Sequence, residues 1–276
     1  MSNYLLPIFA AFACAICNGS AVVLQKVSAD KEKNTNGLEV RLLWRLFQDK
    51  PYILGIFIDF LGWVFTLIAV QYLPLFLVGS IIASGIVVAA FIERFFRHQR
   101  IKFKSYLAII AILIGLVLLA IASSSQRAKP ISDTIKYSII LIPVPVAIIA
   151  YVLARRRKYI TTVVLGILSG IAFSGTTTIG RIFRFSQPIW HTIYSPLLLS
   201  IIVSGILGLL LFSTALQHAK ATVINATSLT SQTIIAAIIG IVFFGDTARN
   251  GMWYLVIIGI LVALVGVTVL SLSEDN

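Results

Sequence analysis

Charged residues are scarce in this chain. Only 12% of its 276 residues are Asp, Glu, Lys or Arg, whereas 59% are hydrophobic. Soluble domains typically have about 25% charged and about 45–50% apolar residues. A soluble fold of this length has no interior large enough to bury so much apolar surface. The composition therefore excludes an ordinary soluble domain and indicates a protein that lies in a lipid bilayer.

Sequence signatures of catalysis and of metal binding are also missing. There is no Walker lysine loop, no HExxH helix and no GxSxG elbow. The three histidines, His98, His191 and His218, each fall near the edge of an apolar run. Cys14 and Cys17 form a lone CxxC pair inside the first apolar run, and we interpret them as small packing residues rather than as a redox or metal motif. We therefore expect neither an enzyme nor a bound metal or cofactor.

Positive charge exceeds negative charge, with 22 Lys and Arg against 10 Asp and Glu. In a soluble protein this balance would point to nucleic acid. Here the basic residues stand between apolar runs and not on one amphipathic face. They fit topology signals and contacts with the headgroups of membrane lipids, so we expect membrane lipids and no nucleic acid as partners.

Nine apolar runs are long enough to cross a bilayer. The fifth contains Pro143 and Pro145, which are expected to kink it. The first run lacks a basic leader and is interpreted as an uncleaved span. The predicted spans are residues 4–25, 52–71, 73–93, 104–123, 136–154, 160–180, 193–216, 221–244 and 251–272.

The basic residues predict the orientation of these spans. If the N-terminus lies outside, sixteen of the 22 Lys and Arg fall on the cytoplasmic side. The positive-inside rule therefore favours an outer N-terminus and a cytoplasmic C-terminus in a plasma membrane or bacterial inner membrane. The segment from Ala29 to Lys50 is too charged to span. Its alternating apolar and basic residues indicate either a short amphipathic helix on the inner surface or a solvated loop.

An internal repeat relates the first four spans to the last four. The eight residues from Tyr106 match those from Tyr254 at six positions. At nearly the same offset, the Ala-Val-Gln that ends at Gln71 matches the Ala-Leu-Gln that ends at Gln217. A weaker match pairs the first span with the sixth. The repeats are therefore residues 1–125 and 159–276, and residues 126–158 contain one linking helix.

The linking helix decides the relative direction of the repeats. Four spans plus one make an odd number of crossings, so the second repeat enters the membrane from the opposite side. We predict an all-α integral membrane protein with two inverted four-helix repeats. This architecture is typical of secondary transporters, which bind substrate between the halves near the middle of the membrane.

The sequence also resembles a known group of transporters. The run from Gly62 through Gln71 to Pro74, followed by a span that ends in Ile92-Glu93-Arg94, is similar to the drug/metabolite transporter superfamily. The later Ala-Leu-Gln and the Gly245-Asp246 that ends the eighth span repeat this pattern. The resemblance covers nearly the whole chain. It implies alternating-access transport of a small molecule.

Within that superfamily, nine spans with a polar segment after the first resemble the NIPA-type magnesium transporters. The first span, with Gly19 and Leu24-Gln25-Lys26, fits that group as well. NIPA-type proteins carry an acidic residue directly after the glycine that matches Gly62, where this chain has Trp63. The nearest acid is Asp59, and an Asp before Leu-Gly in this helix resembles EamA-like bacterial permeases more closely.

Asp59 is the acidic residue that lies deepest inside an apolar run, and a carboxyl group at that depth is a functional hypothesis by default. We expect it to face a cavity and to couple transport to protons, although a structural hydrogen bond or snorkelling to a headgroup would also explain it. Trp63 lies one helical turn away and predicts either a cavity wall, with a cation–π surface, or a lipid contact.

Other polar residues are candidates for the same cavity. Asn225, Ser228 and Gln232 share one face of the eighth span, where helix–helix hydrogen bonding is the alternative role. Lys26 and Arg181 occupy equivalent repeat positions and are interpreted as headgroup anchors. The predicted substrate and coupling set is completed by Asn18, Gln25 and Ser84.

The sequence therefore predicts a secondary transporter of the drug/metabolite type, a monomer or homodimer, that moves a small organic metabolite with proton coupling at Asp59. Transport of magnesium or another divalent cation is one alternative. It is less favoured because Mg²⁺ prefers carboxylate ligands and only Asp59 lies deep. A flippase for a lipid-linked head group is a second alternative.

Overall fold

In the described part of the chain, the regular elements are all α-helices. The computed structural model describes residues 5–32, 40–73, 75–96, 102–122, 141, 143–154, 159–182, 195–249 and 251–275. The helices are α1 Leu5–Ala29, α2 Val40–Leu46, α3 Lys50–Tyr72, α4 Leu75–Ala83, α5 Gly85–Phe96, α6 Phe103–Ala122, α8 Pro143–Ala154, α9 Tyr159–Ile182, α11 Pro196–Leu216, α12 Ala221–Phe243 and α13 Trp253–Asp275.

The described residues contain eight helical segments that are long and apolar enough to cross a bilayer. In lipid, backbone groups must bond within the segment, which a helix achieves. Large apolar side chains cover the outer faces of these helices, as Phe9 (72% exposed) and Ile257 (59% exposed) illustrate. Such a surface is stable only against lipid. The prediction of an all-α integral membrane protein is confirmed.

The predicted fifth span corresponds in part to α8. Residues 136–140 and 142 of that span lie outside the described residues, and α8 begins at Pro143. Both prolines stand in its first turn, where a missing N–H group breaks no helical hydrogen bond, so no kink is needed. The chain leaves α6 and enters α9 at opposite ends of the bundle. The eight spanning segments among the described residues match the other eight predicted spans, and the ninth stays a prediction.

The predicted third span is interrupted. Helix α4 ends at Ala83 and α5 begins at Gly85, so the span expected to be continuous over 73–93 is two helices joined at Ser84. The hydroxyl of Ser84 donates to the carbonyl of Ile81 at 2.6 Å. Directly after the break, Gly85 lies against the backbone of α1 at Ala15, an approach that leaves no room for a β-carbon.

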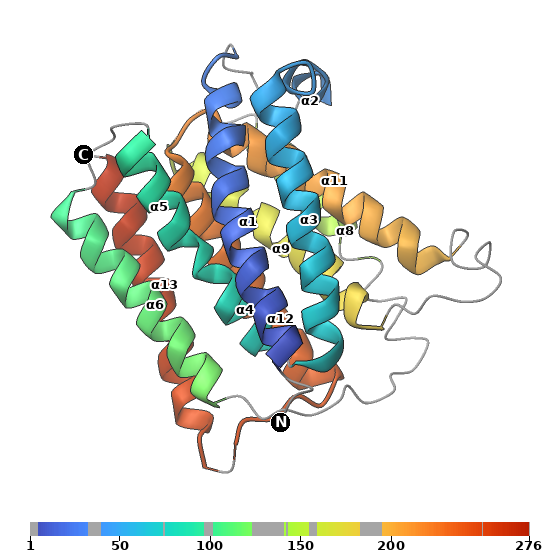
Figure 1. The fold of residues 1–276 in the computed structure, drawn as a ribbon, viewed down its shortest axis with the longest axis vertical. Coiled ribbons are helices and arrows are strands. Elements are labelled where there is room, and N and C mark those ends of the chain that lie inside the picture. Colours follow the sequence, from blue (N-terminus) through green and yellow to red (C-terminus); the bar gives the residue numbers. More distant parts are fainter. Residues whose placement is uncertain are drawn as a thin grey trace.

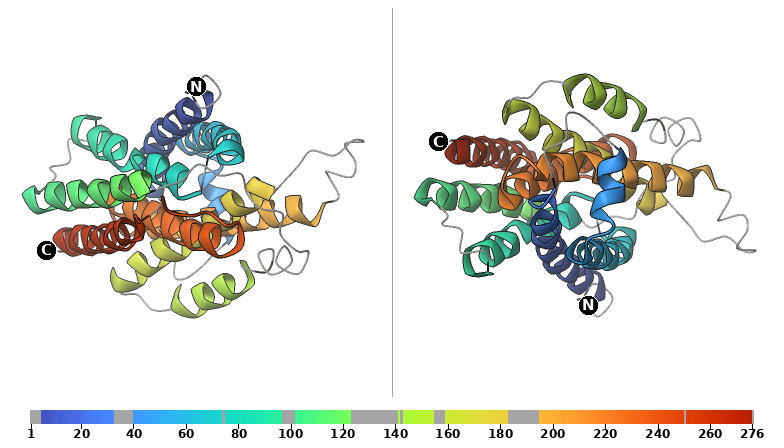
Figure 2. Two further views of the ribbon diagram at one scale, coloured as in Figure 1. Left: turned by 90° about the horizontal axis from the view of Figure 1, so that it is seen from below. Right: turned by 90° about the horizontal axis from the view of Figure 1, so that it is seen from above.

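The first four spans and the last four make equivalent contacts. Helix α1 packs on α3 as α9 packs on α11, and α1 contacts α4 and α5 as α9 contacts α12. The largest contact between the sets pairs α6 with α13, which lie side by side at one edge of the bundle (Figures 1 and 2). Gly115 and Gly259 allow these two helices to approach closely.

Equivalent helices in the two sets run in opposite directions. The amide of Arg249, just before α13, donates to the carbonyl of Ala122 at the end of α6. Tyr52 at the start of α3 bonds Ser213 near the end of α11. The termini accordingly lie at opposite ends of the bundle (Figure 1). These directions are those of an inverted repeat.

The segment between α1 and α3 contains the short helix α2, as predicted. Its apolar face does not lie on a membrane surface, because Leu42 and Leu46 are fully buried against Tyr52 and Leu210. Trp44 points outward and is 71% exposed. Helix α2 therefore closes one end of the bundle over α3 and α11.

Each end of the bundle contains a buried carboxylate that bonds the first turn of a helix in the other repeat. Glu93, near the end of α5, accepts hydrogen bonds from the amides of Ala221 and Thr222 at 3.1 and 3.0 Å and from the Thr222 hydroxyl. Asp246, after α12, accepts from the amide of Leu75 at 3.3 Å. Carboxylates satisfy and neutralise helix N-termini in this position. At both ends, a carboxylate that follows one span therefore bonds the start of a helix in the other repeat.

Lys26 and Arg181 are not headgroup anchors, which corrects the prediction from the sequence. Arg181 is 3% exposed and forms two hydrogen bonds with the carboxylate of Asp246, at 2.5 and 2.8 Å. Lys26 is 6% exposed, donates to the carbonyl of Leu216 at 2.6 Å and pairs with Asp30 at 2.7 Å. Asp246 and Leu216 lie far from Arg181 and Lys26 in the sequence, so an inspection of each span alone places both basic residues at its rim.

The Arg181–Asp246 pair gives a test of the fold. Asp246→Ala leaves a buried guanidinium without its carboxylate, which costs about 3–5 kcal/mol. We expect a clear loss of thermal stability in the detergent-solubilised protein. The double variant Arg181→Met/Asp246→Leu leaves no unpaired charge and should recover most of the loss. An Asp246→Ala protein as stable as the parent would contradict the role of this pair.

Candidate functional site: a central cavity between the two repeats

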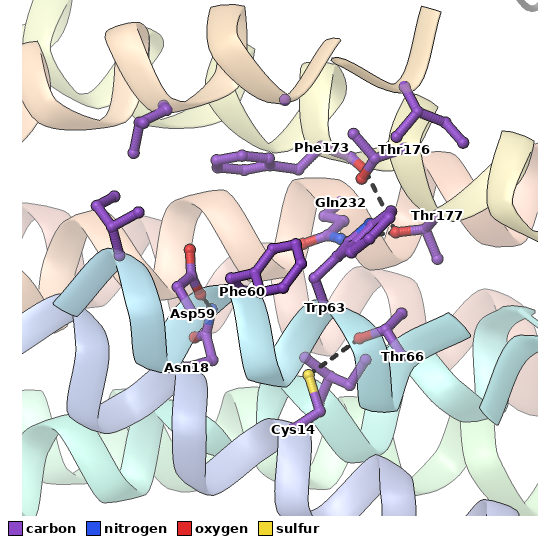
Figure 3. A pocket seen from close by; sticks show the side chains of 15 residues that line it. Cys14, Asn18, Asp59, Phe60, Trp63, Thr66, Phe173, Thr176, Thr177 and Gln232 are labelled. Carbon is purple, nitrogen blue, oxygen red and sulfur yellow. Dashed lines mark hydrogen bonds between the residues drawn. The ribbon is translucent and has the colours of Figure 1, made fainter. Parts of the chain in front are cut away.

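A cavity of about 300 Å³ lies between the two sets of helices. Residues from the middle of α1, α3, α9 and α12, and from α4 and α11, line it, so both repeats contribute. Figure 3 shows the side chains of α3 extending across the cavity toward α9. The lining residues are Cys14, Asn18, Ile56, Asp59, Phe60, Trp63, Thr66, Ile82, Phe173, Thr176, Thr177, Ile201, Gly205, Leu209 and Gln232.

Asp59 is the only carboxylate among these lining residues. Asn18 of α1 donates a long hydrogen bond of 3.5 Å from Nδ2 to its Oδ1 atom. Gln25, further along α1, lies close to the same carboxyl group. These partners are neutral amides, so they stabilise the carboxylate without neutralising its charge.

Aromatic and small hydroxyl side chains form the rest of the wall. Phe60 and Trp63 lie next to each other, with ring centroids 5.8 Å apart, and Phe173 faces them from α9 (Figure 3). Of the two roles predicted for Trp63, the structure therefore shows the cavity wall. Thr66 bonds the Cys14 thiol at 3.0 Å, which fits the predicted packing role of that cysteine.

A second, much smaller chamber adjoins the cavity. It has a volume of about 20 Å³, and Asn18, Asp59 and Gln232 line both spaces. Three further polar residues, Gln25, Asn225 and Ser228, line the chamber alone, and each is at most 2% exposed. Its remaining lining residues are Val22, Phe173, Leu209, Phe212 and Leu229.

Seven of the eight residues predicted for the site line these two spaces. The exception is Ser84, which lines neither space and instead bonds the backbone at the break between α4 and α5. The polar face predicted on α12 points inward. Ser228 accepts from the Ser169 hydroxyl of α9 at 2.9 Å, and Gln232 donates to Thr177 at 2.9 Å.

The residues predicted for the site include neither Phe173 of α9 nor any residue of α11. Phe173 lines both spaces. Gly205, which occupies the same position in the second repeat as Asp59 does in the first, lines the main cavity. The signal for Gly205 was present, because the repeat aligns it with Asp59. Phe173 lies in an apolar run where nothing distinguishes it from lipid-facing phenylalanines.

The charge of the site is unusual. None of the described residues that line the two spaces is Lys, Arg or His. Within the described ranges, no three His, Cys, Asp or Glu side chains gather closely enough to hold a metal ion. The site is therefore a small, mostly apolar cavity with one carboxylate, several amides and no cation of its own. It can bind a proton or a cationic group at Asp59.

Comparison with known proteins gives one similarity of note. No protein-family model matches the chain, and no solved structure matches it. The chain is 21% identical over 258 residues to a protein of Arabidopsis thaliana described as "Probable magnesium transporter NIPA9", covering 86% of this chain and 74% of that protein. The match includes both sets of helices and supports a multi-pass membrane protein that functions in transport.

Proposed function

We propose that the protein is a secondary transporter that moves a small organic solute by alternating access, with Asp59 as the group that couples transport to protons. The observation that carries the proposal is the central cavity, which lies between two oppositely oriented sets of helices and holds a single carboxylate. Substrate sites of inverted-repeat transporters occupy this position. A volume of about 300 Å³ suits a small molecule.

The two ends of the bundle supply a basis for alternating access. Glu93 joins α5 to α12 at one end, and Asp246 joins α12 to α4 at the other. Each contact connects the two repeats, so rocking of one repeat against the other opens one end while the other stays closed. The break at Ser84 lies between these contacts and provides a point where the α4–α5 span can bend.

Asp59 meets the requirement for a coupling group. Lipid does not solvate a carboxylate, so the residue must be neutral or accompanied by a cation when the cavity is closed. A proton drives transport only if the two access states bind it with different affinity. A carboxylate between two repeats that move relative to each other changes its surroundings in every cycle.

Asp59→Asn tests this role. The amide keeps the shape of the side chain but binds no proton. We expect proton-driven accumulation of substrate in proteoliposomes to be lost, whereas exchange of substrate across the membrane persists. The control is Asp49→Asn, which neutralises a carboxylate outside the cavity and should leave accumulation unchanged. Accumulation by Asp59→Asn at the parent level would remove Asp59 from the mechanism.

Gly205 offers a test of the cavity itself. A β-carbon at this position meets nothing closer than Thr176, at 3.9 Å, so Gly205→Ala should fold and transport normally. Gly205→Leu extends the side chain into the cavity and should block transport while thermal stability changes little. A β-carbon added at Gly208, three residues later, would lie only 2.7 Å from the Phe173 ring, so Gly208→Ala should instead lower stability. Full transport by Gly205→Leu would exclude this cavity as the substrate route.

Transport of Mg²⁺ is a second candidate, favoured by the similarity to the Arabidopsis protein. Mg²⁺ binds oxygen ligands and keeps several of its waters. The main cavity has room for such a hydrated ion beside Asp59, Asn18 and Gln232. Liposomes loaded with a Mg²⁺ indicator distinguish the candidates. Mg²⁺ entry that is lost in both Asp59→Asn and Gly205→Leu would establish this candidate in place of the organic solute.

We further propose that the protein lies in a plasma membrane or bacterial inner membrane with the N-terminus outside. The Lys26 end of the bundle then faces the cytoplasm, together with the starts of α3, α6 and α9. That end receives most of the basic residues under the positive-inside rule.

A further inference from the structure

The small chamber beside Asp59 has the properties of an ion site. Its volume of about 20 Å³ accommodates one water-sized particle. It is lined by the Asp59 carboxylate, the amides of Asn18, Gln25, Asn225 and Gln232, and the Ser228 hydroxyl. Oxygen atoms of these kinds are the ligands that hard cations prefer. The chamber extends from Asp59 between α1 and α12, on the side away from Trp63.

Two side-chain atoms at the chamber lack a hydrogen-bond partner among the described residues. Asn225 is 1% exposed and lines the chamber, and its Nδ2 atom has no hydrogen-bond partner among the described residues. The Oδ1 atom of Asn18 is likewise unpaired in the described structure. Because leaving such groups unsatisfied is costly, they indicate a missing ligand. The two ends of an amide have nearly the same shape, so Asn225 can present either its nitrogen or its oxygen.

Neighbouring bonds orient the other amides toward a cation. The Nε2 atom of Gln232 is engaged by Thr177 at 2.9 Å, which leaves its oxygen for the chamber. In Figure 3 this oxygen faces the side on which Asp59 lies. The Nδ2 atom of Asn18 is directed to Asp59, so its unpaired oxygen is the atom that remains. The chamber therefore presents oxygen atoms beside a carboxylate that has no basic partner among the described lining residues.

We propose that this chamber binds one dehydrated monovalent cation, Na⁺, whose charge balances that of Asp59. The inference rests on the proposed function and adds a second ion to the same carboxylate. One positive charge neutralises one carboxylate, whereas a divalent ion would leave an excess charge in a medium that solvates it poorly. A chamber for a single particle also excludes Mg²⁺ with its retained waters.

Proton and Na⁺ would then compete at Asp59. The other titratable groups that interact electrostatically with Asp59 are Cys14 and Cys17 of α1 and Tyr52 of α3. None of these three side chains can carry a positive charge, so none can neutralise the Asp59 carboxylate. Binding of Na⁺ should therefore strengthen as pH rises and the proton leaves the carboxyl group. The amides of α1 and α12 would separate or close around the ion as the repeats move.

The test measures binding of radioactive sodium to the purified protein in detergent, by scintillation proximity. We expect saturable binding that Li⁺ competes for, that K⁺, choline and Mg²⁺ at equal ionic strength do not, and that weakens at low pH. Asn225→Leu should weaken binding by about tenfold or more, because a ligand to a charged group is lost. Asp59→Asn should abolish it. Thr230→Val is the matched control, because Thr230 is buried on the same helix and has an unpaired hydroxyl but lines neither space.

The outcomes separate this inference from the proposed function. Absence of sodium binding in a parent protein that still accumulates substrate with protons would overturn the inference and leave the transporter intact. The chamber would then hold a water molecule. Competition by Mg²⁺ at the same site would also overturn it. Equal sodium binding by Asn225→Leu and Thr230→Val would place the ion elsewhere. If a misfolded Asn225→Leu protein prevents the comparison, Gln25→Leu, on α1, provides the same measurement from the opposite wall.

Discussion

Lipid does not solvate a carboxylate, and this constraint determines the partners of the buried acids in the described core. Glu93 is satisfied by the first amides of α12, and Asp246 by Arg181 and the first amide of α4. Both carboxylates thereby join the two repeats. Asp59 has only neutral amides around it. It is therefore the carboxylate whose compensation has to come from a proton or a bound cation.

The contacts at the ends and in the centre of the bundle obey different rules. At the ends, the inverted repeat holds: a carboxylate after one span bonds the start of the equivalent span in the other repeat. In the centre the symmetry is lost. Asp59 of α3 and its repeat equivalent on α11, Gly205, both line the cavity, but only Asp59 carries a charge. Equivalent carboxylate contacts at the two ends suit a structure that can open at either end. A centre with a single carboxylate suits a site that neutralises one positive charge at a time.

The sequence was sufficient for eight of the nine predicted spans and for most of the central residues, because both depend on local signals. A run of apolar residues predicts a helix in lipid, and a carboxylate within such a run predicts a cavity. The break at Ser84 was missed because it goes with the close approach of Gly85 to α1. The burial of Lys26 and Arg181 was missed because Leu216 and Asp246 are far away in the sequence. From the sequence, Arg181 is predicted to lie at the rim of its span. Its burial is explained only by the ion pair with Asp246, which the structure shows.

A carboxylate on only one repeat is compatible with coupling in both access states. The cavity lies near the middle of the helices and both repeats line it, so under the proposed alternating access the same Asp59 would be reached from either end. A second carboxylate at the Gly205 position would repel the first and require another cation. The small residue there leaves space for solute opposite the charge, and the amides of α1 and α12 hold the space behind it. In the proposed mechanism, solute and coupling ion would occupy neighbouring volumes that share one charged group, so the binding of each would depend on the other.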